Sequence, residues 1–498
     1  MQKKKARYPR RRVEQLAPAE PVDRPPLFPH APRRQDDYLE SLISQKDFNP
    51  IKSHQFEGAI HLGFVVLTIL IVKYAFLSLY THGYLLLKSN TAVYCISYEL
   101  LRMLICDCGE GLGALPTFLL YKLFLGKVIG KTALRAMHYV YISLFSAVSL
   151  WSQWDMPPLP ALISVMLMGT YVLKMHSYVA TNILLHDRVT EKYEDIVGPS
   201  PGKVPPQVPR FTNSALTQHP PQAEKDEGHR SVIDPDSVYP SNVNFKNYLY
   251  FIFCAPSLVY ETKFSRSQNV RVLYVIRELC GFFFLCFGLI SIITQFILPV
   301  MAVPGDESLM SVLGDIFSVC IPSLFVWLLA IYAYFHCWLN AKSELVRFSN
   351  RVFYKDWWNA DSIGAFWRKW NLPVHEWCLR HLYLESMYYF HATKDVATVL
   401  VLLVMTVMHE IFFSCAFKAY HPFFLITVIA QIPLVFLNRK VKNSRRVGNV
   451  IMWISLMFGQ PLLEILYFRT WIATQHRDAG SFWCRSAAAW LNPGCGAT

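Results

Sequence analysis

Long apolar runs separated by short polar connections dominate the sequence, and they predict a bundle of membrane-crossing helices. A helix rises about 1.5 Å per residue, so about 20 apolar residues cross the roughly 30 Å hydrocarbon layer of a bilayer. Nine runs reach or approach that length, although charged residues interrupt the second of them. The nine predicted spans are residues 59–80, 95–121, 134–153, 158–176, 271–300, 311–340, 396–418, 421–438 and 448–468.

The polar segments divide the chain into five parts. Residues 1–58 begin with a basic, proline-rich stretch, in which ten Lys or Arg accompany three Asp or Glu within the first 34 residues. This composition predicts a disordered cytosolic arm. Residues 59–186 hold the first four spans, and residues 187–245, rich in Pro, Gly and charge, predict a flexible cytosolic linker. Residues 246–475 carry the remaining spans, and residues 476–498 form a tail.

The basic residues predict the orientation of the bundle, because Lys and Arg are retained on the cytoplasmic side of a membrane. With the N-terminus in the cytosol, basic clusters fall in the inside connections, such as residues 439–446. The outside connections at 152–158 and 302–308 contain no Lys or Arg. Nine spans then place the C-terminal tail in the lumen. The net charge of +13 therefore reflects topology, and we expect no binding to nucleic acid.

Composition supports a membrane protein and gives no sign of a metal or cofactor. Of the 498 residues, 53% are hydrophobic and 17% are charged, which is too apolar for an ordinary soluble protein of this length. The twelve cysteines are scattered without a paired ligand spacing, and Cys106 and Cys108 are too close for a zinc knuckle. No glycine-rich phosphate loop stands out. The sequence therefore predicts no metal site and no cofactor.

One adjacent pair of ionisable residues, His409 and Glu410, lies inside the apolar run 396–417. Burying such residues in a bilayer costs a few kcal/mol, so they normally face the bundle interior or a polar cavity. An imidazole is suited to moving a proton near neutral pH, which makes His409 a candidate general base. Glu410 points about 100° away on a helix and is predicted to orient neighbouring groups. The alternative is a histidine that only bonds a neighbouring helix.

An aromatic and basic segment lies between the sixth and seventh predicted spans. It contains the heptad FYKDWWN at residues 353–359, followed by FWRKWNLPVHEWCLRHLY at 366–383. Alternation of aromatic and basic residues is typical of amphipathic helices at a membrane surface. An interfacial belt without a binding role is the alternative. The stretch 239–258 is also aromatic but shorter than a span, and we predict that it is interfacial or re-entrant.

The heptad, the HEWCLRHLY motif and the later intramembrane histidine together resemble the membrane-bound O-acyltransferase superfamily. The similarity is to its acyl-CoA:diacylglycerol and acyl-CoA:sterol acyltransferase branch, over about residues 170–475. It implies an all-α polytopic fold, with about nine transmembrane helices around an intramembrane reaction chamber and amphipathic cytosolic helices. It also implies an endoplasmic reticulum membrane location, acyl-CoA as the acyl donor, and a homodimer or homotetramer.

The resemblance also assigns candidate site residues. The catalytic histidine of the family matches His409, and the asparagine that ends the heptad matches Asn359. A lipid hydroxyl that attacks a thioester directly needs a base and a group that stabilises the oxyanion, but no nucleophilic side chain. The further residues predicted to bind acyl-CoA or the acceptor are Phe353, Tyr354, Asp356, Trp357, Trp358, His375, His381, Glu410, Gln431 and Gln460.

The identity of the acyl acceptor rests on weaker motifs that disagree. NLPVHEWCLRHLY and the segments holding Gln431 and Gln460 resemble the diacylglycerol enzymes, whereas MHSYVATN at 175–182 and WIATQH at 471–476 resemble the sterol enzymes. We favour diacylglycerol because the two glutamines fall within spans beside the predicted chamber. Synthesis of steryl esters is the first alternative. A transporter is the second, and it explains the buried charges but not the heptad.

Overall fold

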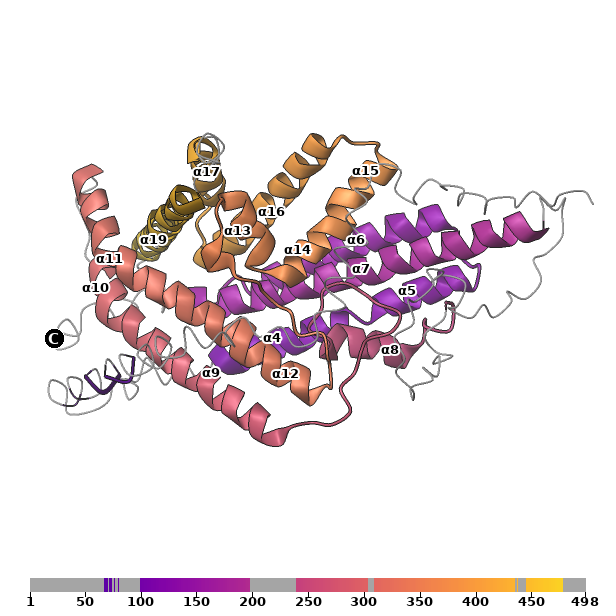
Figure 1. Ribbon diagram of the computed structural model, residues 1–498, viewed down its shortest axis with the longest axis horizontal. Helices are drawn as coiled ribbons and strands as arrows, with labels where there is room; N and C mark the ends of the chain where they lie inside the picture. Colours follow the sequence, from indigo (N-terminus) through magenta and orange to yellow (C-terminus); the bar gives the residue numbers. More distant parts are fainter. Residues whose placement is uncertain are drawn as a thin grey trace, which may run out of the picture.

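The computed structural model describes residues 99–197, 239–302, 309–434 and 445–477, with residue 437 and parts of 67–79 (Figure 1). Within these residues the chain is helical throughout its regular structure, apart from an isolated β-bridge between Arg266 and Phe348. The predicted all-α fold is confirmed. The predicted N-terminal arm, most of the first span, the central part of the linker and residues 478–498 lie outside the described residues.

The N-terminal half of the described chain is built on α7, a 40-residue helix about 60 Å long that packs against both α4 and α6 (Figure 1). Proline at the first position of α5 and of α7 favours these helix starts, since the first turn needs no N–H donor there. The bounds are α4 Leu100–Gly113, α5 Pro116–Leu125, α6 Lys131–Ser152 and α7 Pro158–Val197.

The C-terminal half contains two groups of helices. In the first group, α9 lies beside α11 and α12 (Figure 1). The helices of this group are α8 Phe245–Leu249, η5 Tyr250–Cys254, α9 Val272–Ile292, η6 Ile293–Ile297, α10 Leu298–Ala302, α11 Leu309–Ile331, η7 Tyr332–Trp338 and α12 Leu339–Leu345. In the second group, α16 packs on α7 and on α19. The helices of this group are η8 Trp357–Asn359, α13 Ile363–Lys369, α14 Leu372–Cys378, η9 Leu379–Leu384, α15 Glu385–Tyr389, α16 Lys394–Phe417, α17 Phe423–Ala430 and α19 Arg445–Arg477.

Seven helical stretches among the described residues are long and apolar enough to cross a membrane, as expected of a multi-pass membrane protein. They match seven of the nine predicted spans. The predicted run 421–438 contains the shorter apolar helix Phe423–Leu434, and most of the run 59–80 is not described. The seven stretches are Leu100–Leu125, Lys131–Ser152, Pro158–Thr190, Val272–Met301, Met310–Leu345, Lys394–Phe417 and Arg445–Trp471.

Two of the charged residues that interrupt the second predicted span bond to other helices. The Glu110 carboxylate accepts hydrogen bonds from Ser149 Oγ and from Gln153 Nε2, the latter at 2.6 Å. The Asp107 carboxylate accepts one from Ser164 Oγ of α7 at 2.6 Å. Hydrogen bonds between helices are the usual partners of polar side chains within a membrane bundle. These residues are therefore compatible with a span.

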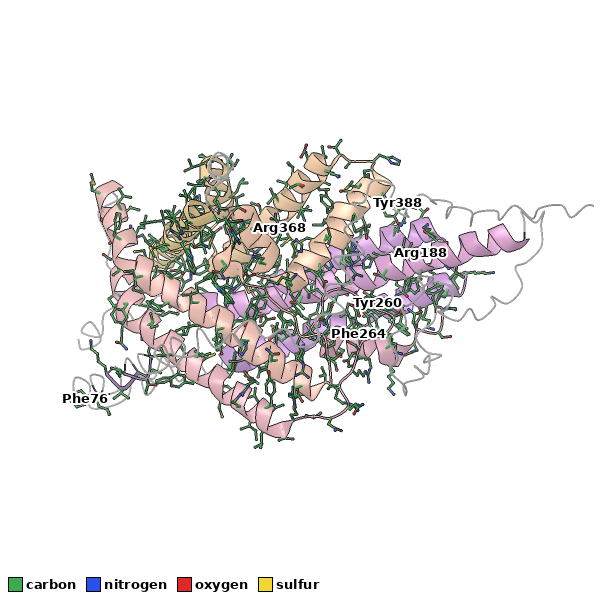
Figure 2. All side chains as sticks on the ribbon, viewed as in Figure 1. Phe76, Arg188, Tyr260, Phe264, Arg368 and Tyr388 are labelled. Carbon is green, nitrogen blue, oxygen red and sulfur yellow. The ribbon has the colours of Figure 1, made fainter. Side chains whose placement is uncertain are left out.

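A cluster of buried aromatic rings joins the segment after the linker to the first helices. Tyr248 and Phe251 are fully buried, and Tyr260 and Phe264 pack into the same cluster (Figure 2). The stretch 239–258 therefore packs against the first helices, and its interfacial or re-entrant position stays a prediction. At the two ends of the predicted linker, α7 continues to Val197, and Tyr239 Oη lies 3.2 Å from Tyr121 Oη.

Lys174 fixes the end of the short helix η5 from within α7. Its side chain is 2% exposed, and Nζ donates to three backbone carbonyls, of Phe251 at 2.8 Å, Ile252 at 3.1 Å and Ala255 at 2.6 Å. The last carbonyls of a helix have no partner within the helix. The ammonium group supplies that partner and ties residues 251–255 to α7.

Candidate active site

His409 lies in α16, which the Thr393 side chain caps by accepting a hydrogen bond from Val396 N. Its Nδ1 lies 2.7 Å from the carbonyl oxygen of Met405, one turn earlier, and the ring stacks on Phe424 of α17 with centroids 4.9 Å apart. A carbonyl oxygen only accepts, so Nδ1 carries the proton. In the neutral ring, Nε2 then keeps a lone pair, which is the form required of a general base.

Glu410 connects three helices beside His409. Its Oε1 accepts hydrogen bonds from Tyr467 Oη of α19 at 2.6 Å and from Ser414 Oγ at 3.2 Å, and its Oε2 accepts one from the backbone N of Leu425 in α17 at 3.0 Å. The carboxylate thus ties α17 and α19 to the helix that carries His409. This geometry fits the predicted orienting role of Glu410, which remains a prediction.

Tyr467→Phe is expected to loosen this junction while keeping the ring that stacks on Phe413. Loss of a hydrogen bond to a charged group costs about 1.5–3 kcal/mol. We expect a lower melting temperature in detergent and slower turnover in the acyl-transfer assay that the sequence resemblance implies. The matched control is Tyr420→Phe, since Tyr420 is 61% exposed. Equal behaviour of the two variants would contradict a role for the Tyr467 hydroxyl.

Close packing of α7 against α16 occurs next to the histidine. A Cβ atom added at Gly169 would lie 2.6 Å from Cζ of Phe412, and the Phe412 ring lies 6.3 Å from that of His409. Gly169→Val is therefore expected to push α16 away from α7, at a cost of about 1–3 kcal/mol. The measurement is acyl transfer at matched expression. Gly314→Val is the control, since nothing lies within 4 Å of its added Cβ, and it should retain activity.

The heptad is extended and ends in the short 3-10 turn η8, so it is not itself an amphipathic helix. The Lys355 backbone N donates to the Lys369 carbonyl at 2.8 Å, and the Leu372 N donates to the Phe353 carbonyl at 3.0 Å. The amphipathic helices predicted here are α13 and α14, which begin after the capping residues Ser362 and Asn371. The heptad packs against these helices as part of the protein core.

The aromatic rings of the heptad fill a cluster between α11 and α19. Phe353, Tyr354 and Trp357 are buried, and Trp358 is half-buried. The Trp357 ring lies 5.2 Å from Trp327 and 5.8 Å from Trp453. Interdigitated rings of this kind leave few alternative rotamers and hold the segment rigidly.

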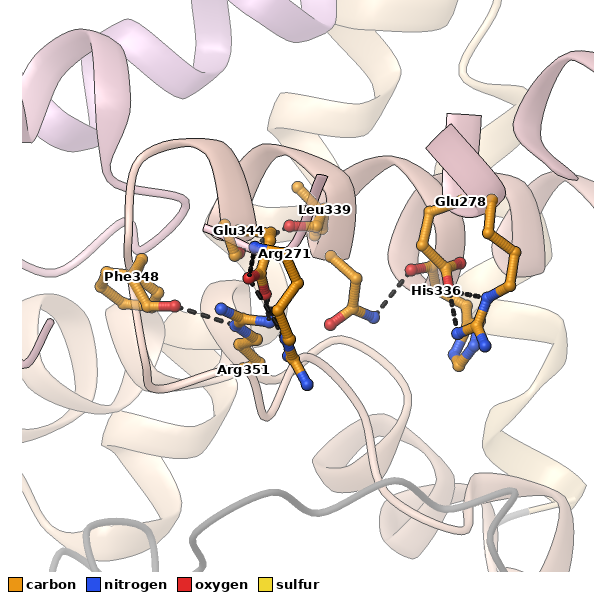
Figure 3. Close-up of polar contacts among 10 residues, drawn as sticks. Arg271, Glu278, His336, Leu339, Glu344, Phe348 and Arg351 are labelled. Atoms are coloured by element: carbon orange, nitrogen blue, oxygen red, sulfur yellow. Dashed lines mark hydrogen bonds and ion pairs between the residues drawn. The ribbon is translucent and has the colours of Figure 1, made fainter. Parts of the chain in front are cut away.

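Polar contacts fix the heptad and the loop before it, and Figure 3 shows those made by Glu344 next to that loop. Glu344 of α12 accepts hydrogen bonds from Arg271, including one from Nη2 at 3.0 Å, and forms an ion pair with Arg351. Within the heptad, Tyr354 Oη lies 3.0 Å from His336 Nδ1, and Asp356 forms an ion pair with Lys369 at 3.0 Å.

Asn359 lies apart from His409 in this arrangement. Its side chain is exposed on η8, and no hydrogen bond joins it to His409 among the contacts of the described residues. The heptad contacts α19 near Trp453, whereas the residues around His409 contact it at Tyr467, about 21 Å further along the helix. The predicted role of Asn359 at the oxyanion stays a prediction.

The other predicted residues have separate surroundings. Gln460 Nε2 donates to Glu464 at 2.9 Å and to the Ser323 carbonyl at 3.4 Å, so it bridges α19 and α11. Gln431 is half-buried at the end of α17. Burial, together with the charges of Arg368 and Lys355, lowers the pKa of His375 to about 4. His375 is therefore neutral at physiological pH.

His381 belongs to a third group of side chains, between α7 and α15. Its Nδ1 lies 2.9 Å from Glu385 Oε1, and its Nε2 lies 2.8 Å from Ser177 Oγ. Burial lowers the pKa of His381 to about 3, so the imidazole is neutral. The structure thus distributes the predicted site residues over three groups, around His409, the heptad and His381.

Comparison with known proteins identifies the family. The sequence profile of the membrane-bound O-acyltransferase family matches residues 119–469, which is more than half of the chain. The chain belongs to the membrane-bound O-acyltransferase family. The matched region includes all three groups of predicted site residues, and the resemblance inferred from the two motifs is confirmed.

Three similar proteins are all named as diacylglycerol O-acyltransferases. Diacylglycerol O-acyltransferase 1A of Glycine max is 34% identical over 261 residues, which are 51% of each chain. Diacylglycerol O-acyltransferase 1 of Bos taurus is 34% identical over 233 residues, 46% of this chain and 47% of its own, and that of Dictyostelium discoideum is 32% identical over 252 residues, 49% and 40%. The chain thus matches about half the length of these relatives or less.

Sequence reasoning did not identify three residues that hold these parts of the structure together, namely Lys174, Tyr467 and Ser177. Lys174 stands alone as a charge in an apolar run, and an ionisable residue at that depth is itself a signal. Tyr467 and Ser177 gave no signal, because a tyrosine or serine in a span is common. Their importance comes only from the partners that folding brings to them.

Proposed function

We propose that this protein transfers a fatty acyl group from acyl-CoA to the hydroxyl of diacylglycerol, forming triacylglycerol and free coenzyme A. The observation that carries the proposal is the His409 ring, held in an apolar helix with Nδ1 bonded to a carbonyl and Nε2 left as a base. Family membership and the names of the relatives support the reaction class and the acceptor.

The proposed reaction balances without a covalent enzyme intermediate. The acceptor oxygen attacks the thioester carbon as Nε2 of His409 takes the hydroxyl proton. The C–O bond forms, the C–S bond breaks, and the proton passes from Nε2 to the departing sulfur. A neutral imidazole contributes about 10² to 10⁴ to the rate by such transfer.

The cytosolic side of the heptad is the proposed site for coenzyme A. Lys355 lies within the heptad, Arg368 and Lys369 lie on or next to the segment that pairs with it, and Arg368 is exposed (Figure 2). Cationic side chains of this kind attract phosphate groups. We place the protein in the endoplasmic reticulum membrane, with the N-terminus cytosolic and the C-terminus luminal, and propose a homodimer or homotetramer.

The acceptor is tested with purified protein in lipid nanodiscs, given oleoyl-CoA together with diolein or cholesterol. Products are separated by thin-layer chromatography, and release of the free thiol is followed in parallel. We expect triolein as the main ester. Cholesteryl oleate as the main product would show that the acceptor is a sterol and not diacylglycerol. Thiol release without any ester would overturn the proposed transfer.

A further inference from the structure

Two histidines and a glutamate from three different elements come together in the described part of the chain. His176 comes from α7, His381 from η9 and Glu385 from α15, and one ligand atom of each lies within 4.8 Å of the others. His381 is 6% exposed, and the Glu385 side chain is 26% exposed. We propose that this histidine–glutamate cluster binds a divalent transition-metal ion.

The donor set fits such an ion. Two neutral imidazoles and one carboxylate are ligands of Zn²⁺ and of related divalent metals, with further positions left to water. His381 Nδ1 lies 2.9 Å from Glu385 Oε1. Two atoms bound to one metal at about 2.1 Å and the tetrahedral angle are separated by roughly 3.4 Å. The His381–Glu385 pair therefore needs only a small adjustment to accept the ion. The ligand atom of His176, within 4.8 Å of the other two, moves closer to them when the ion binds.

Ser177 orients the His381 ring for this role. The Ser177 hydroxyl oxygen lies 2.8 Å from His381 Nε2 and also accepts a hydrogen bond from the backbone N of Tyr260 at 2.9 Å. When Nε2–H donates to this oxygen, the Nδ1 lone pair faces Glu385. Ligating histidines commonly donate their second N–H to an oxygen atom, which fixes the ring and its tautomer. Ser177 is thus a positioning residue.

A second observation points to a polar occupant beside the cluster. His138 of α6 is 2% exposed, and neither ring nitrogen has a hydrogen-bond partner in the described part of the chain. Its ring stacks on His176, with centroids 5.9 Å apart and an interplanar angle of 25°. A buried imidazole without a partner is costly. Water bound to the proposed ion is a suitable partner for it.

The surroundings of the histidine–glutamate cluster suit a metal ion that links α7 to η9, the helix that follows α14. The Trp377 ring lies 5.7 Å from His176 and 5.5 Å from His381, so an aromatic wall limits solvent on one side. The Arg135 guanidinium donates to Tyr389 Oη at 3.2 Å. Sequence spacing predicted no metal site because the two histidines are 205 positions apart along the chain.

The test measures metal directly in the purified full-length protein. Metal content is determined by mass spectrometry, and the chelator-treated protein is then titrated with Co²⁺ while its visible absorption is recorded. We expect one bound ion per chain, with d–d bands on Co²⁺ addition. His176→Ala and Glu385→Gln should weaken Co²⁺ binding at least about tenfold. His391→Asn, which alters an exposed histidine, is the control and should bind as the unmodified protein does.

Glu385→Gln keeps the shape of the side chain, so it separates loss of a ligand from loss of the fold. A folded Glu385→Gln protein that binds Co²⁺ normally would overturn the proposal. So would absence of both stoichiometric metal and d–d bands from the unmodified protein, which would leave the cluster as a hydrogen-bonded link only. None of these readouts depends on acyl transfer, so the metal site and the proposed function fail or hold separately.

Discussion

His409→Ala is expected to lower triacylglycerol formation by about 10²- to 10⁴-fold, the usual contribution of a positioned general base. The alanine removes the Nε2 lone pair, while the carboxylate of Glu410 still ties α16 to α17 and α19. The fold around the site should therefore persist. The measurement is the initial rate with oleoyl-CoA and diolein, at matched protein concentration and confirmed monodispersity.

His421→Ala is the matched control for this result, because His421 is exposed in the connection between α16 and α17. It should retain the rate of the unmodified protein. If the His409→Ala protein keeps more than about a tenth of that rate, the imidazole is not the group that takes the proton. Activity in that case would have to come from another base.

Lys174→Met is expected to lower thermal stability more than any surface substitution. Methionine fills the space of the lysine stem but leaves three buried carbonyls, those of residues 251, 252 and 255, without their donor. Unsatisfied buried acceptors cost about 1–3 kcal/mol each. Removal of the buried charge offsets part of this cost, so we expect a net loss of about 2–4 kcal/mol. Heat-induced loss of the monodisperse peak in detergent measures the change.

Two further variants show whether the donors themselves are responsible. Lys246→Met changes an exposed lysine of α8, close to the same segment, and should leave the unfolding temperature unchanged. Lys174→Arg restores hydrogen-bond donors in a bulkier side chain. Its unfolding temperature should lie between those of Lys174→Met and the unmodified protein. Equal unfolding temperatures for Lys174→Met and the unmodified protein would show that the three contacts do not stabilise the fold.

The spans were predictable because hydropathy along one helix depends only on local sequence. His409 was predictable for the same reason, since an imidazole within apolar residues is visible without knowledge of its neighbours. The heptad was recognised by its residues, but its extended conformation was not. Its backbone pairs with the turn at residues 369–372, and its rings pack on Trp327 and Trp453. Such long-range partners override local periodicity.

Boundaries and partners were less predictable than spans. The polar sequence after residue 186 predicted a linker, yet α7 runs on to Val197, and Asp187 forms an ion pair with Lys131. Polar residues on a helix resemble those of a loop in composition. The bond from Tyr467 to Glu410 joins residues 57 positions apart, and no pattern in either segment foretells it.

The length of α7 has a consequence for how the protein senses its lipid environment. One helix carries Gly169 against α16, Lys174 against residues 251–255, and His176 in the histidine–glutamate cluster. Helices adapt to a thinner or thicker bilayer mainly by changing their tilt. Reorientation of α7 would displace His409, through the packing of α7 on α16, together with the parts packed against residues 174–177. Phospholipid chain length should therefore alter turnover even when both substrates are saturating.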